Sequence, residues 1–185
     1  MGKIYDTIDN RLAEFIGQQK MYFVATAPSG EEGHVNLSPK GYDSFAILGP
    51  NKVAYADPGG SGIETVAHLR QNGRITIMFC AFEGPANILR LYGQGSVIQH
   101  DEPGFDDAMA SFPTIERARN VIVAEVSRIS DSCGWGIPFY SYEGERDQLS
   151  RWVVKKPEGE WWDNRLTKNK ESIDGLPGLV PHASE

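Results

Sequence analysis

The sequence has little cysteine and no long hydrophobic run. Cys80 and Cys133 are its two cysteines, and their separation matches no CxxC or zinc-binding spacing. Two reduced thiols are the simplest interpretation, because disulfides are rare in cytoplasmic proteins. No window approaches the ~20 apolar residues that a membrane span needs, and the N-terminal residues lack the apolar region of a signal peptide. We therefore expect a cytoplasmic protein with no membrane partner.

Positive charge is also scarce. The 18 basic residues are outnumbered by 25 acidic ones, which gives a net charge of −7. This balance disfavours non-specific binding to nucleic acid, although a local basic pocket could still bind a small anion. The length of 185 residues predicts one domain over 1–185, and 40% hydrophobic and 23% charged residues are ordinary values for a globular protein.

Recognisable metal and nucleophile signatures are missing as well. The four histidines, His34, His68, His100 and His182, have no i,i+4 partner and no nearby cluster of cysteine or glutamate. His68 falls in a predicted helix and is expected to be packed or solvent-facing. The sequence contains no serine nucleophile elbow and no Cys–His–Asn pattern. We assign no metal ligand and no catalytic residue.

Short segments rich in β-branched and aromatic residues, separated by turns, dominate the chain up to residue 132. They predict strands over 21–27, 34–38, 44–49, 52–57, 74–82, 88–99 and 121–130. Helical spacing predicts helices over 7–17, 63–73, 146–156 and 160–170, and one or two short helices over 102–112 and 114–120. The Gly/Pro-rich tail, 172–185, is expected to be extended or frayed. The fold class is mainly β (α+β), with a barrel or sandwich over about 20–132 and a helical extension over about 146–185.

A glycine-rich loop, Asp57-Pro58-Gly59-Gly60-Ser61-Gly62, leads into the second predicted helix. Such a loop frees backbone N–H groups, and the helix dipole adds partial positive charge, so a phosphate fits there. The Ser61 hydroxyl can donate a hydrogen bond, and Thr65 lies one helical turn further on. The alternative is a plain strand–turn–helix connection in which Ser61 caps the helix.

The stretch "VNLSPKG" begins like a strand and ends in Ser38-Pro39-Lys40. Pro39 has no N–H to donate, so the chain is expected to turn there and place Lys40 beside Ser38 at the rim of the sheet. Lys40 is then a candidate anion ligand, or else an exposed turn lysine.

Two further glycine motifs suggest different roles. Gly93-x-Gly95 lies inside a predicted strand and is interpreted as structural, for example a bulge. In "SCGWGIP", glycines flank Trp135 near the end of a predicted strand. The ring could face a flat ligand or a partner chain, or simply pack in a tight turn.

Taken together, "FVATA", "GHVNLSPKG", "KVAYADPGGSGIETVAHLRQNGRITIMFCAFEG" and "ILRLYGQGSV" resemble the pyridoxamine 5'-phosphate oxidase-like family of FMN-binding split barrels. The resemblance covers about 8–128, and "SCGWGIP" and "SIDGLPGL" extend it over nearly the whole chain. It implies a six-stranded antiparallel split β-barrel with peripheral helices, a homodimer, and FMN in clefts at the dimer interface. The cofactor-binding residues it implies are Asn36, Ser38, Pro39, Lys40, Asp57, Ser61, Gly62, Thr65 and Trp135.

The sequence departs from the true oxidases of this family at two places. Where they carry Ser-Arg-Lys at the start of the helix, this chain has Ile63-Glu64-Thr65, and their C-terminal Arg-x-His signature is missing. Pyridoxamine phosphate oxidation is therefore not expected. The resemblance favours an FMN-dependent oxidoreductase acting on an unidentified small molecule. The alternatives are a non-enzymatic flavin binder, a barrel that uses another cofactor such as a deazaflavin or haem, or a structural dimer.

Overall fold

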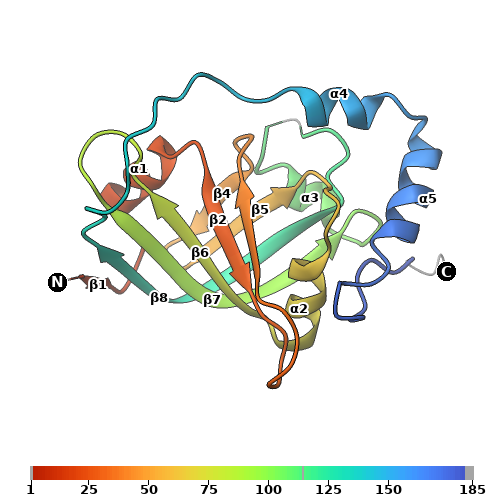
Figure 1. The fold of residues 1–185 in the computed structure, drawn as a ribbon, viewed down its shortest axis with the longest axis horizontal. Helices are drawn as coiled ribbons and strands as arrows, with labels where there is room; N and C mark the ends of the chain where they lie inside the picture. The colour runs from red at the N-terminus through yellow and green to blue at the C-terminus, as the bar shows by residue number, and fades with distance from the viewer. Residues whose placement is uncertain (1, 114, 182–185) are drawn as a thin grey trace.

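One antiparallel sheet organises the computed structural model, which describes residues 2–113 and 115–181 (Figure 1). Its strands are β1 (Ile4–Tyr5), β2 (Tyr22–Thr26), β3 (Asn36–Lys40), β4 (Phe45–Gly49), β5 (Lys52–Asp57), β6 (Arg74–Cys80), β7 (Ile88–Gln99) and β8 (Asn120–Ser132). The pairing order is β3-β2-β6-β7-β8-β5-β4, and β1 pairs with β8. The prediction of a mainly β antiparallel fold is confirmed. The predicted number of six strands is wrong, because the sheet has eight.

The helices lie around this sheet. They are α1 (Asn10–Gln18), α2 (Glu64–Asn72), α3 (Phe105–Met109), α4 (Gln148–Val154) and α5 (Glu158–Lys168). Asp9 caps α1 by accepting a hydrogen bond of 2.8 Å from the Leu12 N–H. Gly73 ends α2 in the left-handed region at φ 71°, which favours glycine. The four longer helices predicted from the sequence are confirmed, as α1, α2, α4 and α5.

Two predictions of local structure are corrected. The two-residue strand β1 was not predicted, because so short a segment shows no periodicity. No helix forms over residues 115–119. Instead, the Arg119 N–H donates to the Asp57 carbonyl at 2.9 Å, and β8 begins at the next residue. The bulge suggested at Gly93 is confirmed by a register shift between Tyr92 and Gly93. A side chain at Gly93 would collide with the Glu125 carbonyl, so only glycine fits there.

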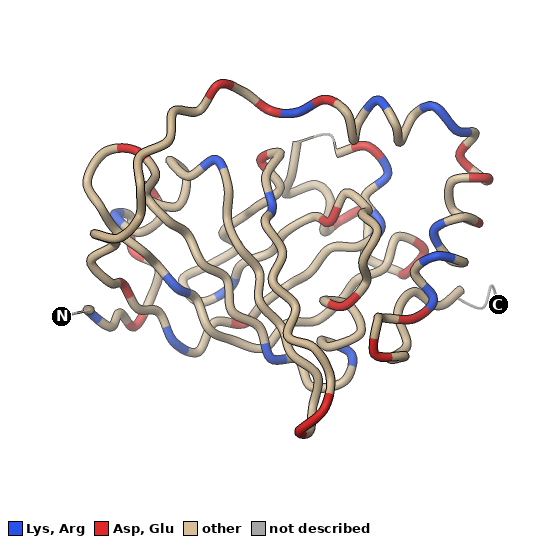
Figure 2. Tube along the Cα trace, in the orientation of Figure 1, with Lys and Arg blue, Asp and Glu red and all other residues tan. Residues whose placement is uncertain are grey.

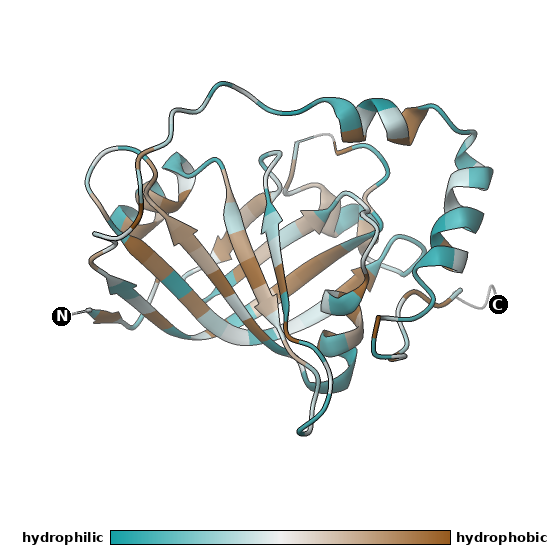
Figure 3. Ribbon diagram, in the orientation of Figure 1, coloured by the Kyte–Doolittle hydropathy of each residue, from teal (hydrophilic) through white to brown (hydrophobic). Residues whose placement is uncertain are grey.

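The core lies between the inner face of the sheet and helices α1 and α2, and the strands carry most of the apolar residues (Figure 3). Its largest fully buried apolar side chains include Tyr55, Phe79, Leu12, Ile63, Leu89 and Ile129. Burying each such side chain contributes roughly 1.5–3 kcal/mol. This core fixes the positions of β3, β5 and the start of α2, which carry the candidate site.

After β8 the chain crosses over the sheet to α4 and α5 (Figure 1). Acidic residues lie at the start of α5 and basic residues at its end, and the tip of the β2–β3 hairpin is acidic (Figure 2). The tail was predicted to be extended or frayed; over 172–181 it forms no helix or strand, but part of it is packed. Leu179 is buried and its N–H donates to the Asn169 carbonyl at 2.8 Å. Residues 182–185, including His182, lie outside the described residues.

Candidate functional site

The candidate site begins at β3, an edge strand whose only partner in the sheet is β2. The turn predicted at Pro39 is wrong, because β3 continues through Pro39 and Lys40 in register with β2. A proline is tolerated on an edge strand, where its missing N–H can face away from the sheet. The strand therefore places Asn36, Ser38 and Lys40 on its half-buried face, while Leu37 and Pro39 lie on the exposed face.

A hydrogen-bond network fixes the Asn36 side chain. Its Nδ2 donates to Thr65 Oγ1 at 2.9 Å and to Thr26 Oγ1 at 3.3 Å, and its Oδ1 accepts from Ser38 Oγ at 3.1 Å. Thr26 Oγ1 is in turn 3.0 Å from Nδ1 of His68, which is fully buried. Burial lowers the pKa of His68, so its ring is neutral at pH 7. The network joins β2, β3 and α2 and presents an oriented amide.

Lys40 points to a buried carboxylate. Its Nζ lies 3.0 Å from Asp57 Oδ1, and Arg119 contacts Asp57 Oδ2 through Nε at 2.9 Å and Nη2 at 2.8 Å. Burial by itself would raise the pKa of Asp57, but the charges of Arg119 and Lys40 outweigh it and hold that pKa well below its usual range. Asp57 is therefore an ionised bridge between two cations.

The glycine-rich loop rests on side chains from the C-terminal part of the chain. Nη1 of Arg165 donates to the Gly60 carbonyl at 3.0 Å, and Asn169 Nδ2 donates to the Ser61 carbonyl at 3.2 Å. Arg119 also reaches the Gly60 carbonyl at 3.4 Å and Asn169 Oδ1 at 3.0 Å. Burial and the nearby charge of Arg119 lower the pKa of Arg165. The Gly60 carbonyl is thus held by two buried guanidinium groups, and the Ser61 carbonyl by the Asn169 amide.

The N-terminus of α2 has no side-chain cap. Its N-cap is Ile63, so the alternative prediction that Ser61 caps this helix is wrong. Within the described residues, the N–H groups of Ser61 and Gly62 donate no hydrogen bond. The Glu64 carboxylate folds back on Gly62, where it would collide with any side chain. Glu64 Oε1 also accepts from the Ile173 N–H at 3.3 Å.

A cavity of about 570 Å³ lies beside this helix start. Its walls are the beginning of β3, residues 61–64, and the C-terminal residues 168 and 171–173. His34 and Asp174 fasten the C-terminal wall to β3, with the His34 N–H 2.8 Å from Asp174 Oδ2 and the ring Nδ1 2.6 Å from Oδ1. The uncapped helix end therefore faces an open pocket large enough for a small ligand.

The residues proposed from the sequence fall mostly into three sets. Hydrogen bonds join the first, an ion pair joins the second, and the third lies in the glycine-rich loop beside the cavity: Asn36, Ser38 and Thr65; Lys40 and Asp57; Ser61 and Gly62.

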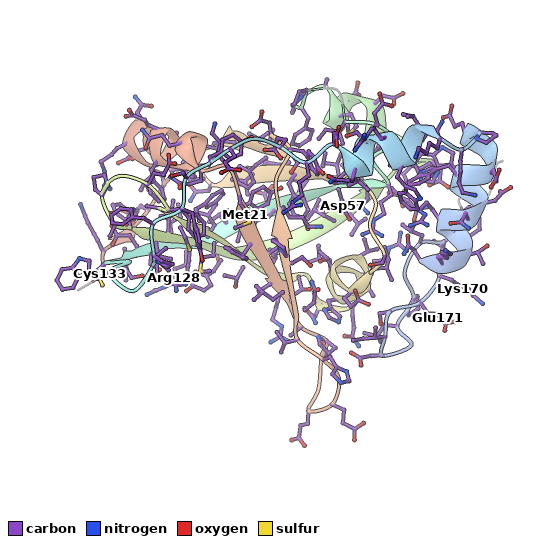
Figure 4. The ribbon with its side chains drawn as sticks, turned by 45° about the horizontal axis from the view of Figure 1, so that its top comes forward. Met21, Asp57, Arg128, Cys133, Lys170 and Glu171 are labelled. Carbon is purple, nitrogen blue, oxygen red and sulfur yellow. The ribbon has the colours of Figure 1, made fainter. Side chains whose placement is uncertain are left out.

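Pro39 and Trp135 are placed elsewhere. Pro39 is on the opposite face of β3. Trp135 is 85% exposed and follows Ser132, which pairs with Ile88, whereas Asp57 pairs with Asn120 at the other end of the 13-residue strand β8. Figure 4 shows Cys133 at one end of the molecule and Asp57, Lys170 and Glu171 toward the other. Trp135 does not reach the loop of its own chain.

Sequence reasoning missed Arg119, Arg165, Thr26 and Asn169. Neither arginine belongs to a motif, and each meets the loop from more than 50 positions away in the sequence. The single usable signal was Asp57 itself, since a carboxylate at the end of a buried strand needs a cationic partner.

Both cysteines are free, as predicted, with Cys80 buried and Cys133 exposed. Over residues 2–113 and 115–181, no group of three or more histidine, cysteine or acidic side chains could hold a metal ion. In the same part of the chain, every helix is too short or too polar to span a bilayer.

The chain combines an antiparallel sheet that has few helices with a glycine-rich loop that leads into an uncapped helix. Both features agree with the family that the sequence resembles. The sequence model of the pyridoxamine 5'-phosphate oxidase family matches residues 8–133. The chain is also 35% identical over 192 residues to the pyridoxamine 5'-phosphate oxidase family protein ustO of Aspergillus flavus, covering 95% of this chain and 77% of that protein. The chain therefore belongs to the pyridoxamine 5'-phosphate oxidase family.

Solved structures show the same fold. A HupZ variant from Group A Streptococcus superposes with a TM-score of 0.54 at 22% identity, over 68% of this chain and 99% of the other. A pyridoxinephosphate oxidase family protein from Clostridium acetobutylicum gives a TM-score of 0.50 at 14% identity, over 66% and 86% of the two chains. At these identities the likeness concerns the fold alone.

Proposed function

We propose that this protein binds FMN and is a flavin-dependent oxidoreductase that acts on a small molecule. The observation that carries the proposal is the start of α2, where the N–H groups of Ser61 and Gly62 have no acceptor and Ile63 provides no cap. These N–H groups and the Ser61 hydroxyl would hold the phosphate, because a helix N-terminus stabilises an anion.

The charge around the loop supports an anion there despite the missing Ser-Arg-Lys. Lys40 and Arg119 flank the Asp57 carboxylate, and Arg165 lies close enough to Arg119 for that charge to lower its pKa. The excess positive charge is supplied from β3, from the residue before β8 and from α5 rather than from the helix start. The residues present therefore fit a phosphate-bearing cofactor.

The flavin would supply the redox chemistry, while the protein would bind and orient the flavin and exclude water from it. The residues of β3 would flank the flavin ring, with the Asn36 amide held by Thr65 and Thr26 and the Ser38 hydroxyl committed to Asn36. Both hydrogens of this amide are already donated to Thr65 and Thr26, so only Oδ1 can make a further contact, as an acceptor at one fixed position, which favours a single orientation of the ring. No side chain of this site is proposed as a catalytic acid or base.

We further propose that two copies pair with the cofactor at their interface. Val35, just before β3, and Leu37, on the exposed face of β3, are 75% and 63% exposed, and such apolar side chains at a sheet edge favour a partner chain. Trp135 does not reach the site of its own chain, so its contact with the flavin would come from the second copy.

One observation favours the alternative of a non-enzymatic binder or another cofactor. The Glu64 carboxylate lies against Gly62, where it competes with a phosphate for the loop. A ligand without a phosphate would avoid this competition.

The test is a visible absorption spectrum of the protein purified without added cofactor, followed by titrations with FMN and with riboflavin. We expect FMN to bind at least ten times more tightly than riboflavin, which lacks the phosphate. Equal affinities would contradict the phosphate site, and no binding of either would favour another cofactor. Bleaching of the bound flavin by NAD(P)H with turnover would then separate an enzyme from a simple binder.

A further inference from the structure

A second and larger cavity lies at the other end of β3. It measures about 1440 Å³ and runs between α1, the start of β2, the β6–β7 loop (81–87) and the segment 140–146. Residues 140–146 belong to the stretch that crosses over the sheet between β8 and α4 (Figure 1). We call this cavity the groove and residues 140–146 its roof. Its volume exceeds the roughly 300–1,000 Å³ that is usual for small-molecule sites.

The walls of the groove are aromatic and carry little net charge. The rings of Phe15, Phe23, Phe82, Tyr140 and Tyr142 line it. Four basic and three acidic side chains also line it, and one of the basic ones, Lys40, is already paired with Asp57. The remaining charges balance, so the walls favour an uncharged ligand with aromatic surface.

The roof is fastened to the β6–β7 loop. The Tyr140 N–H donates to the Phe82 carbonyl at 3.1 Å, and the Tyr142 N–H donates to Glu83 Oε1 at 3.1 Å. The Phe82 and Tyr140 rings lie 5.6 Å apart, and Lys20 Nζ lies 5.7 Å from the Tyr142 ring. Tyr140 and Tyr142 nevertheless remain 63% and 47% exposed, so their rings keep surface for a further contact.

β3 connects this groove to the candidate flavin site. Residues 34–37 line the smaller cavity at α2, and residues 39–42 line the groove. A cofactor held at α2 and extended along β3 would therefore end at the mouth of the groove.

We propose that the groove is the substrate compartment of this protein and takes a bulky, mainly aromatic molecule without net charge. This inference rests on the proposed flavin function. A small phosphate ester such as pyridoxamine phosphate fits these walls poorly, because they offer mainly apolar and aromatic surface and as many acidic as unpaired basic side chains.

Nile red, a neutral planar dye that fluoresces in apolar surroundings, is a suitable probe. Gly17 lies on α1 in the wall of the groove, and Gly159 lies on α5 away from it; a side chain added at either position meets no atom within 4 Å. The Gly17→Trp variant should obstruct the groove at its α1 wall, and the Gly159→Trp variant is its matched control. We expect Nile red to bind wild type and Gly159→Trp equally, and to bind Gly17→Trp at least tenfold more weakly.

Failure of Nile red to bind wild type, or equal binding by Gly17→Trp, would overturn the proposal. So would a wild-type dimer that Gly17→Trp converts to monomers, because the groove would then be covered by a second copy. FMN titrations of the same proteins separate the two proposals. Dye binding that is lost in Gly17→Trp while no variant binds FMN would contradict the flavin function and leave the groove as an aromatic binding site.

Discussion

Arg119 places both Nε and Nη2 within 2.9 Å of one oxygen of Asp57, and both side chains are almost completely buried. Removing the guanidinium leaves a buried carboxylate with Lys40 as its remaining cationic partner. We expect Arg119→Leu to lower the free energy of unfolding by about 3–5 kcal/mol, as for other broken buried pairs. Urea denaturation measures this change.

The exposed pair of Arg151 and Asp147 is the matched control, since both side chains are more than 60% exposed. Arg151→Leu should cost no more than about 0.5 kcal/mol. Similar losses in both variants would mean that the buried cluster has no special role in stability.

The same carboxylate makes stability depend on pH. The pKa of Asp57 is lowered in the folded protein, whereas in the unfolded chain it is about 3.9. A lowered folded pKa stabilises the protein above the unfolded value, and this contribution is lost as the pH falls below about 4 toward the folded pKa. The free energy of unfolding should therefore decrease from pH 5 to pH 3, with a smaller slope in Asp57→Asn. An unchanged slope in this variant would show that other carboxyl groups cause the dependence.

Glu64 should weaken phosphate binding. Because its carboxylate lies against Gly62, Glu64→Gln removes a negative charge from the loop. A charge at a helix N-terminus is worth about 1 kcal/mol, so FMN affinity should rise about fivefold while riboflavin affinity stays the same. Fluorescence titration measures both. Glu171→Gln, on the opposite wall of the cavity, is the control for loss of charge alone. A gain of equal size for riboflavin would argue against a phosphate at this loop.

The contact between His34 and Asp174 should hold the C-terminal wall in place. Asp174 accepts from the backbone N–H of His34 and contacts its ring, and Asp174→Ala removes both interactions. We expect faster amide hydrogen exchange over 172–176, measured by mass spectrometry. Leu179 should stay protected, because its N–H bonds to Asn169 independently. Exchange that rises equally at both places would indicate that the whole tail has detached.

The two thiols should differ in reactivity. Cys133 is exposed, whereas Cys80 is buried and burial raises its pKa. At pH 8 a thiol reagent should label one cysteine rapidly and the second only after denaturation. Cys133→Ser should abolish the rapid phase, and persistence of that phase would contradict the burial of Cys80.

Local signals in the sequence predicted the elements but not the charges that meet between them. Helical spacing predicted helices over 7–17 and 63–73, close to α1 and α2, which Asp9 and Gly73 bound in the structure, since caps act over three or four residues. The turn predicted at Pro39 was wrong because a strand at the edge of a sheet can contain a proline. Whether β3 is an edge strand depends on the whole sheet and not on the residues around Pro39. Arg119 and Arg165 carried no local signal at all. Their partners, Asp57 and Gly60, lie 62 and 105 positions away.

The hold of the C-terminal residues on the glycine loop has a consequence for biosynthesis. Gly60 and Ser61 rely on Arg165 and Asn169, and Asn169 is itself fixed by Leu179. A nascent chain that has emerged only as far as β8 possesses the sheet but lacks these donors. The chain must be made past Leu179 before the loop reaches its final shape, so capture of a cofactor at this loop follows the formation of the sheet.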